Sequence, residues 1–187
     1  MTMSVRLAFV LAAAPLAACA GQTVISNGHV EEYYEPQMLA YPASRGGMYT
    51  EVTGNPFQTE KAVLDREVTE AFEAAHFGPS LTFFTEIPTD GAPGFRTVVL
   101  FNPARNANAK HLCSSPDRPQ AEYPAGEVGV MGALCNSEAR LTSATGYVTG
   151  AQGPDDPAVG GLLRQLGLSL FPPAPGVRRD DTDIKVP

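Results

Sequence analysis

The sequence predicts an α+β domain, a two-layer sandwich in which two helices cover one face of an antiparallel sheet of about four to five strands. Apolar residues recur at helical spacing over residues 56–77 and again over residues 156–171. Between these stretches lie four short runs rich in aromatic and β-branched residues. Strands joined by short connections pair as antiparallel hairpins, and an apolar sheet face needs a helical layer to cover it. The order strand, helix, four strands, helix therefore favours one globular domain over residues 47–171.

The domain is expected to open with a short strand, Met48 to Val52, followed by the first helix. Asn55 is a good N-cap residue, Pro56 suits the first helical position, and Gln58 follows the cap by three residues. Gly78 and Pro79 are typical of a helix end. The apolar stripe of this predicted helix consists of Leu64, Val68, Ala71, Phe72 and Ala75.

Two hairpins are expected after the first helix. The first joins its strands through a loop at residues 88–94, and the second through a turn at residues 136–140. The segment 103–126 between the two pairs has no periodicity, so we expect a long loop there. The four predicted strands are residues 81–87, 95–101, 128–135 and 141–149.

The second helix is predicted to begin at Asp156 and Pro157, again a capping residue followed by proline. Three glycines inside it lower its intrinsic stability, so it must depend on tertiary packing. The proline-rich segment 172–187 that follows is expected to be a disordered tail. The apolar stripe of this helix consists of Val159, Leu162, Leu163, Leu166 and Leu170.

The N-terminus has the pattern of an export signal. Arg6 precedes the short apolar run Leu7 to Leu16, which is too short to span a membrane. The residues Leu16-Ala17-Ala18-Cys19 resemble the lipobox of bacterial lipoproteins, in which the cysteine thiol is lipidated and signal peptidase II cuts just before it. The alternative is an ordinary signal peptide cut beside Ala18 or Ala20, with Cys19 unmodified.

The lipoprotein resemblance implies an anchor and a location. Residues 1–18 would be removed as the signal peptide, and Cys19 would carry acyl chains, palmitate among them, that hold the protein on the bilayer. Residues 19–46 contain several Gly, Pro and Tyr residues, and we expect them to form a tether. Ala20, in place of Asp, favours the outer membrane under the enterobacterial sorting rule. The domain would then face the periplasm from the inner leaflet.

Removing a lipidated Cys19 from the cysteine count leaves Cys113 and Cys135. Two remaining cysteines in an exported protein predict one disulfide, which contributes about 3 kcal/mol in the chain-entropy model. Zinc is the competing interpretation, because His111 lies two residues before Cys113. Neither a C-x-x-C nor an H-x-x-x-H spacing accompanies it, so we predict no metal site.

Charge and motifs narrow the function classes. The formal net charge of −7 at pH 7 disfavours nucleic acid as a partner. The sequence contains no G-x-S-x-G, H-E-x-x-H, P-loop or dinucleotide motif, so we predict a protein that is not an enzyme and uses no cofactor. Of the three histidines, His29 falls in the tether, and His76 closes the first helix. His111 beside Cys113 could serve a thiol nucleophile, which the predicted disulfide disfavours.

Carboxylate pairs are the remaining candidates for chemistry. Asp156 is better explained as a helix cap and Asp90 as a turn former, although their neighbours Asp155 and Glu86 could complete pairs.

We therefore expect a non-enzymatic envelope lipoprotein that presents its domain to another envelope protein through an open sheet face or a sheet edge. One alternative is a protein that binds a small apolar or saccharide ligand between the sheet and the loop 103–126. A hydrolase of unrecognised type is another. The polar residues expected on the open face are Thr82, Thr97, Thr142, Ser143 and Thr145.

Overall fold

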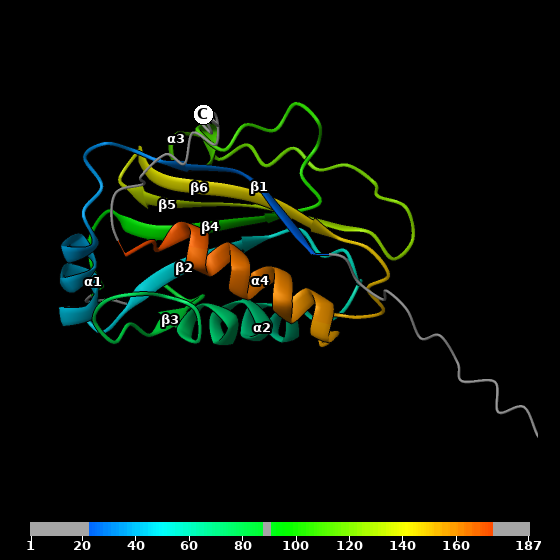
Figure 1. Ribbon diagram of the computed structural model, residues 1–187, viewed down its shortest axis with the longest axis horizontal. Coiled ribbons are helices and arrows are strands. Elements are labelled where there is room, and N and C mark those ends of the chain that lie inside the picture. The colour runs from blue at the N-terminus through cyan, green and yellow to red at the C-terminus, as the bar shows by residue number, and fades with distance from the viewer. Residues whose placement is uncertain (1–22, 88–90, 174–187) are drawn as a thin grey trace, which may run out of the picture.

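A computed structural model describes residues 23–87 and 91–173 as one six-stranded mixed sheet with helices packed on both faces (Figure 1). The strand order is β1-β6-β5-β4-β2-β3. The two long helices, α2 and α4, lie side by side on one face, called here the helix face, and the short helix α3 lies on the other face. The strands are β1 Val24–Val30, β2 Met48–Thr53, β3 Phe83–Phe84, β4 Phe95–Phe101, β5 Val128–Asn136 and β6 Ala139–Val148. The helices are a 3-10 helix at Pro36–Leu39, α1 Ala40–Ser44, α2 Lys61–Glu73, α3 His111–Ser114 and α4 Pro157–Leu170.

The sheet differs from the prediction in strand number and direction. It has six strands where about four to five were expected, and β2 pairs in parallel with both β3 and β4. The predicted hairpin between residues 81–87 and 95–101 is wrong, because β3 and β4 lie on opposite sides of β2. Helix α2 carries the chain across the sheet, as a connection between parallel strands requires. The second predicted hairpin is confirmed, since β5 and β6 pair antiparallel around a tight turn at Ser137.

The predicted start is correct for α4 and wrong for α2. Asp156 caps α4 as expected, and its Oδ1 accepts a hydrogen bond of 2.9 Å from the Ala158 amide. Asn55 does not cap α2. Its side chain instead bonds Thr59, in a turn where Gln58 has a φ of 52°, and α2 begins only at Lys61. The predicted helix over residues 56–77 is therefore shorter at both ends.

The main core lies between the sheet and the two long helices. The predicted apolar stripes of both helices are buried there. Phe72 of α2, Phe83 of β3 and Phe171 after α4 form an aromatic cluster with ring centroids 5.3–5.9 Å apart. Helix α4 approaches the sheet closely at Gly132, where a Cβ atom would come within 2.9 Å of a Leu170 methyl carbon. The glycine-containing α4 is thus supported by packing, as expected.

A second, smaller core covers the middle of the opposite face. Val98 and Leu100 of β4 and alternate residues of β5 pack against Leu112 and Cys113 of α3. The segment 103–126, predicted as a long loop, contains α3 and covers this part of the sheet. An open sheet face is therefore absent over the described part of β4 and β5.

The polar strand residues expected on an open face are largely buried. Thr97 and Thr142 are 0% exposed and Ser143 is 1% exposed. Thr142 Oγ1 faces the helices, where it donates a 2.7 Å hydrogen bond to the carbonyl oxygen of the last residue of α4. Thr82 is exposed, as expected, and Thr145 is partly buried. Alternation along a strand shows which residues share a face, but not whether a loop covers that face.

The predicted tether over residues 19–46 is contradicted from residue 24 onward. Strand β1 pairs with β6, and Tyr34 and Leu39 are fully buried in the main core. Burial raises the pKa of Tyr34 to about 12, and its hydroxyl donates to the Pro172 carbonyl oxygen at 3.1 Å. Residues 1–22 and 174–187, which include the predicted signal peptide, Cys19 and most of the predicted tail, lie outside the described residues.

Adjacent tyrosines allow a direct test of whether this segment belongs to the fold. Tyr34→Ala should lower the free energy of unfolding by about 3 kcal/mol or more, because it removes a fully buried aromatic side chain. Tyr33→Ala is the matched control, since Tyr33 is 53% exposed and should cost about 1 kcal/mol or less. Urea unfolding followed by circular dichroism measures both. Equal losses for the two variants would contradict the placement of Tyr34 in the core.

Candidate functional site

The chain enters the fold at one end of the sheet, called here the entry end. Val24 pairs with Tyr147 near the end of β6, and Thr23 Oγ1 lies 3.4 Å from the Ala158 carbonyl oxygen in the first turn of α4. Strands β2 and β4 also end there. The opposite end of the sheet, called here the far end, contains β3 and the start of β4 (Figure 1). No helix in the described ranges is long and apolar enough to cross a membrane.

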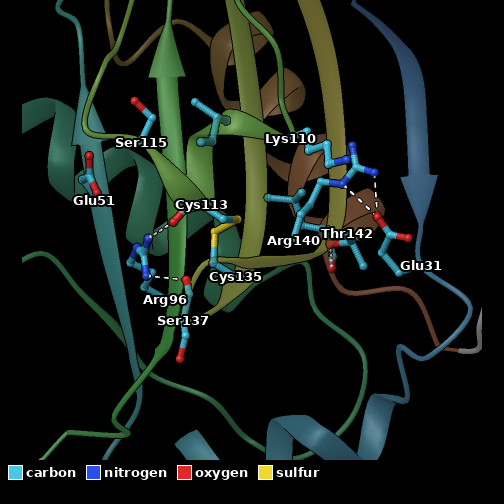
Figure 2. Close-up of a disulfide and its surroundings, with 12 residues drawn as sticks. Glu31, Glu51, Arg96, Lys110, Cys113, Ser115, Cys135, Ser137, Arg140 and Thr142 are labelled. Atoms are coloured by element: carbon cyan, nitrogen blue, oxygen red, sulfur yellow. Dashed lines mark hydrogen bonds and ion pairs between the residues drawn. A yellow bond between two sulfur atoms is a disulfide. The ribbon is translucent and has the colours of Figure 1, made fainter.

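The disulfide between Cys113 and Cys135 is present, as the cysteine count predicts. It joins α3 to β5 with a Cα–Cα distance of 5.5 Å, and Cys135 is fully buried (Figure 2). Arg96 of β4 donates to the carbonyl oxygens of Cys113 and Ser137 beside it. In this state neither sulfur can act as a thiolate ligand or nucleophile, which removes the basis for the zinc and thiol alternatives.

A second arginine holds the same loop to the sheet. Arg118 lies 2.8 Å from Glu51 Oε1 and also donates to the carbonyl oxygen of Leu112, a residue within α3, at 3.1 Å. Its side chain is only 8% exposed. The disulfide and the two arginines thus form one structural unit that fixes α3 against β2, β4 and β5. Its residues are engaged with one another, so we assign it a structural role.

The three histidines lie apart from one another. His29 is in β1, outside any tether, and its Nε2 lies 3.0 Å from Glu31 Oε1. His76 lies three residues beyond the last residue of α2, so it does not close the helix as predicted, and its two ring nitrogens contact the carbonyl oxygens of Phe72 and Pro79 at 3.2 and 3.0 Å. His111 is exposed on α3, on the opposite face of the sheet. Across residues 23–87 and 91–173, no three His, Cys, Asp or Glu side chains are grouped closely enough to hold a metal ion.

The candidate carboxylates have local structural roles or none. Asp156 caps α4 and also accepts from the Gln152 amide, whereas Asp155 and Glu86 are exposed. Asp90 lies outside the described residues.

A carboxylate that sequence reasoning missed is Glu31. Its Oε1 accepts from Arg140 at 2.6 Å, and this hydrogen bond holds the pKa of Glu31 below its ordinary value of 4.5. The pair ties the end of β1 to β6.

An apolar groove lies at the far end. It has a volume of about 380 Å³ and is lined by Tyr49, Phe84, Ile87 and the segment from Gly91 to Arg96. Ile87 is 78% exposed, the largest exposed fraction among the bulky apolar side chains of the described residues. This groove was not predicted from the sequence, because residues 81–87 were expected to form a paired strand.

A polar crevice lies at the entry end, beyond the carboxyl ends of β2 and β4. The segment 54–60 leaves β2 toward the helix face, whereas the segment 102–127 leaves β4 toward the opposite face. Two adjoining depressions of about 340 and 600 Å³ lie between these segments. The ligand-binding alternative placed its site between the sheet and the loop 103–126, which is one wall of this crevice. Both depressions are lined by Pro56, Gln58, Asn102 and Tyr123.

The stabilising role of the Cys113–Cys135 disulfide can be tested by mutation. Replacing both cysteines with alanine should lower the free energy of unfolding by about 3 kcal/mol, because the unfolded chain is no longer cross-linked. Hydrogen exchange should speed up first at the Ala104 and Ala121 amides, which bond within the covering segment, and later in β5. Uniform acceleration over the whole sheet would contradict a local role for the bond.

Comparisons with known proteins identify no family. No protein-family model and no curated protein matches this chain. Among solved structures, the PelC dodecamer from Paraburkholderia phytofirmans is similar to this chain, with 16% sequence identity and a TM-score of 0.41. The match spans 81% of this chain and 97% of the PelC chain. A point variant of the same dodecamer has the same identity and coverage, with a TM-score of 0.39. These values are too low to support a conclusion about function.

Proposed function

We propose that the protein is a lipid-anchored lipoprotein of the bacterial cell envelope, acylated at Cys19 and held at the inner leaflet of the outer membrane, facing the periplasm. One observation carries this proposal. The lipobox-like residues Leu16 to Cys19 stand directly before the folded domain, with only Ala20 to Thr23 between Cys19 and Val24. A signal peptide, an acylated cysteine and the start of the fold thus follow one another without a long spacer.

The short connection orients the domain. An extended chain spans at most about 3.6 Å per residue, so Val24 can lie no more than about 18 Å from Cys19. The entry end must then lie close to the bilayer. Strand β6 runs from the far end to the entry end over ten residues, a length of about 30 Å. The far end is thereby directed toward the periplasm, with its apolar groove available to other proteins.

In this orientation the domain serves as a non-enzymatic interaction module, and the far-end groove receives an apolar side chain of another envelope protein. Exposed Ile87, together with Phe84 and Phe95, supports this choice, since a cluster of exposed apolar groups is a common mark of a protein interface. The groove replaces the open sheet face as the proposed binding surface, because α3 and its loop cover the middle of that face.

A small-ligand-binding lipoprotein is the second candidate function, and the polar crevice at the entry end favours it. A hydrolase has less support. His76 and His111 belong to opposite faces of the sheet, and neither joins a cluster of carboxylates within the described part of the chain.

The acyl anchor predicts a specific labelling result. Cys19→Ser should abolish incorporation of radiolabelled palmitate, because the thiol that receives the diacylglycerol is gone. Ala20→Ser is the matched control, since it leaves Cys19 and the preceding lipobox residues intact and should label normally. Labelling of the Cys19→Ser protein at the control level would end the anchor proposal.

The far-end groove predicts a position-specific partner. A photocrosslinking amino acid at Ile87 should yield one major adduct with an envelope protein in intact cells. The same amino acid at Tyr147, which is 46% exposed near the entry end, should not yield that adduct. Identical adducts at both positions, or only abundant porins at either, would argue against the groove as the docking site.

A further inference from the structure

We propose that the polar crevice at the entry end binds a neutral oligosaccharide. This inference rests on the second candidate function, ligand binding, and is independent of the acyl anchor.

The topology explains why a crevice forms there. Strands β2 and β4 are adjacent and parallel, so both end at the same edge of the sheet. Their connections then leave toward opposite faces, and the space between the two connections is not filled by the sheet or by either core. Ligands bind in the same kind of crevice in open α/β sheets, beyond the carboxyl ends of strands whose connections diverge.

The walls supply side-chain amides at several points. Asn102 Oδ1 accepts from the Gly129 amide at 3.0 Å, which fixes the side chain and leaves its NH₂ group for a ligand. Gln58 and Gln120 are exposed and line the crevice from opposite walls. Amides offer a donor and an acceptor together, which matches the hydroxyl groups of sugars.

Aromatic rings lie beside these amides. Tyr123 Oη donates to the Pro103 carbonyl oxygen at 3.1 Å, which holds the ring in place as part of the wall. Phe57 lines the larger depression from the other connection. A pyranose ring has an apolar face of C–H groups, and an aromatic wall next to amides is suited to bury that face while the hydroxyls are bonded.

The charge of the lining selects against anions. Glu122 and Glu127 line the crevice, and no Lys or Arg is among its lining residues in the described chain. A phosphate or carboxylate would therefore meet like charges in the lining itself, whereas Arg105, whose charge reaches Tyr123, lies outside the lining. The lining carboxylates can still accept hydrogen bonds from neutral hydroxyl groups.

The backbone is strained at two lining positions. Gln58 and Asn102 have φ values of 52° and 47°, in the left-handed region that non-glycine residues adopt at a cost. Asn102 has a structural reason, its bond to Gly129. For Gln58, the unfavourable conformation places the side-chain amide where the two depressions meet, so that Gln58 lines both of them.

The positive φ of Gln58 allows a substitution that removes its side chain without destabilising the fold. Gln58→Gly removes the side chain while easing the positive φ, so the fold should be unharmed. Asn27→Gly is the matched control, because Asn27 also has a φ of 52° but lies in β1, outside the crevice lining. Gln120→Ala tests the opposite wall. All variants are made in the full chain as cells process it, and any detergent used in purification has no sugar headgroup.

The experiment is titration calorimetry and two-dimensional NMR with N,N′-diacetylchitobiose, maltotriose and glucose 1-phosphate. We expect saturable binding of one of the two neutral sugars, and the preferred one distinguishes N-acetylated glycans from plain ones. Binding should weaken about five- to tenfold in Gln58→Gly and in Gln120→Ala, as expected for one lost hydrogen bond each, and remain unchanged in Asn27→Gly.

Three results would overturn the proposal. The first is no saturable binding of either neutral sugar up to about 10 mM. The second is binding that Gln58→Gly and Gln120→Ala leave unchanged, and the third is tighter binding of glucose 1-phosphate. Because Cys19→Ser leaves the crevice intact, loss of the anchor and loss of sugar binding are separate outcomes.

Discussion

The parallel pairing of β2 with β4 is the constraint on which the rest of this structure depends. Two adjacent parallel strands end at the same edge, so the chain must return once across the length of the sheet between them, and α2 makes this return on the helix face. Strand β5 is antiparallel to β4, so the segment with α3 joins neighbouring strand ends and covers the opposite face on the way. Each of these two connections buries one side of the sheet. Both proposed sites then follow from this pairing, the groove at the start of β4 and the crevice at its end.

The two faces are stabilised by different means. The helix face has a large apolar core, with two long helices and an aromatic cluster, and the hydrophobic effect suffices there. The opposite face is covered by a segment with one short helix and few apolar residues. Because apolar burial is smaller here, the disulfide and the hydrogen bonds of Arg96 and Arg118 provide further stabilisation of this face. The proposed export of this protein would place the bond in oxidising surroundings, where disulfides persist.

Local patterns predicted the parts of the fold that depend on local physics. The stripes of α2 and α4, the Asp156 cap and the β5–β6 hairpin could all be derived from residue spacing. The Cys113–Cys135 bond was predicted from the cysteine count, once Cys19 was set aside. The direction of β3 relative to β4 could not, because short β-branched runs look alike in parallel and antiparallel pairs. Strand β1 was missed for a similar reason. It is an edge strand with mostly exposed residues, and its pairing with β6 involves distant parts of the sequence.

The same limit applies to the candidate sites. Gln58, Asn102 and Gln120 belong to two separate connections, and only the parallel pairing brings these connections together. A search by motif therefore cannot find the crevice, although each of its residues is visible in the sequence.

The acidity of the chain bears on why an acyl anchor suits this domain. A net charge of −7 gives no overall electrostatic attraction to anionic lipids. Covalent acyl chains supply binding that does not depend on the charge of the surface. With β1 starting at Val24, such an anchor also restricts orientation, which a long tether would not. The polar crevice would then lie next to the bilayer and the apolar groove about 30 Å away from it. A ligand beside the membrane and a protein partner in the periplasm could be bound at once, because the two sites share no residue.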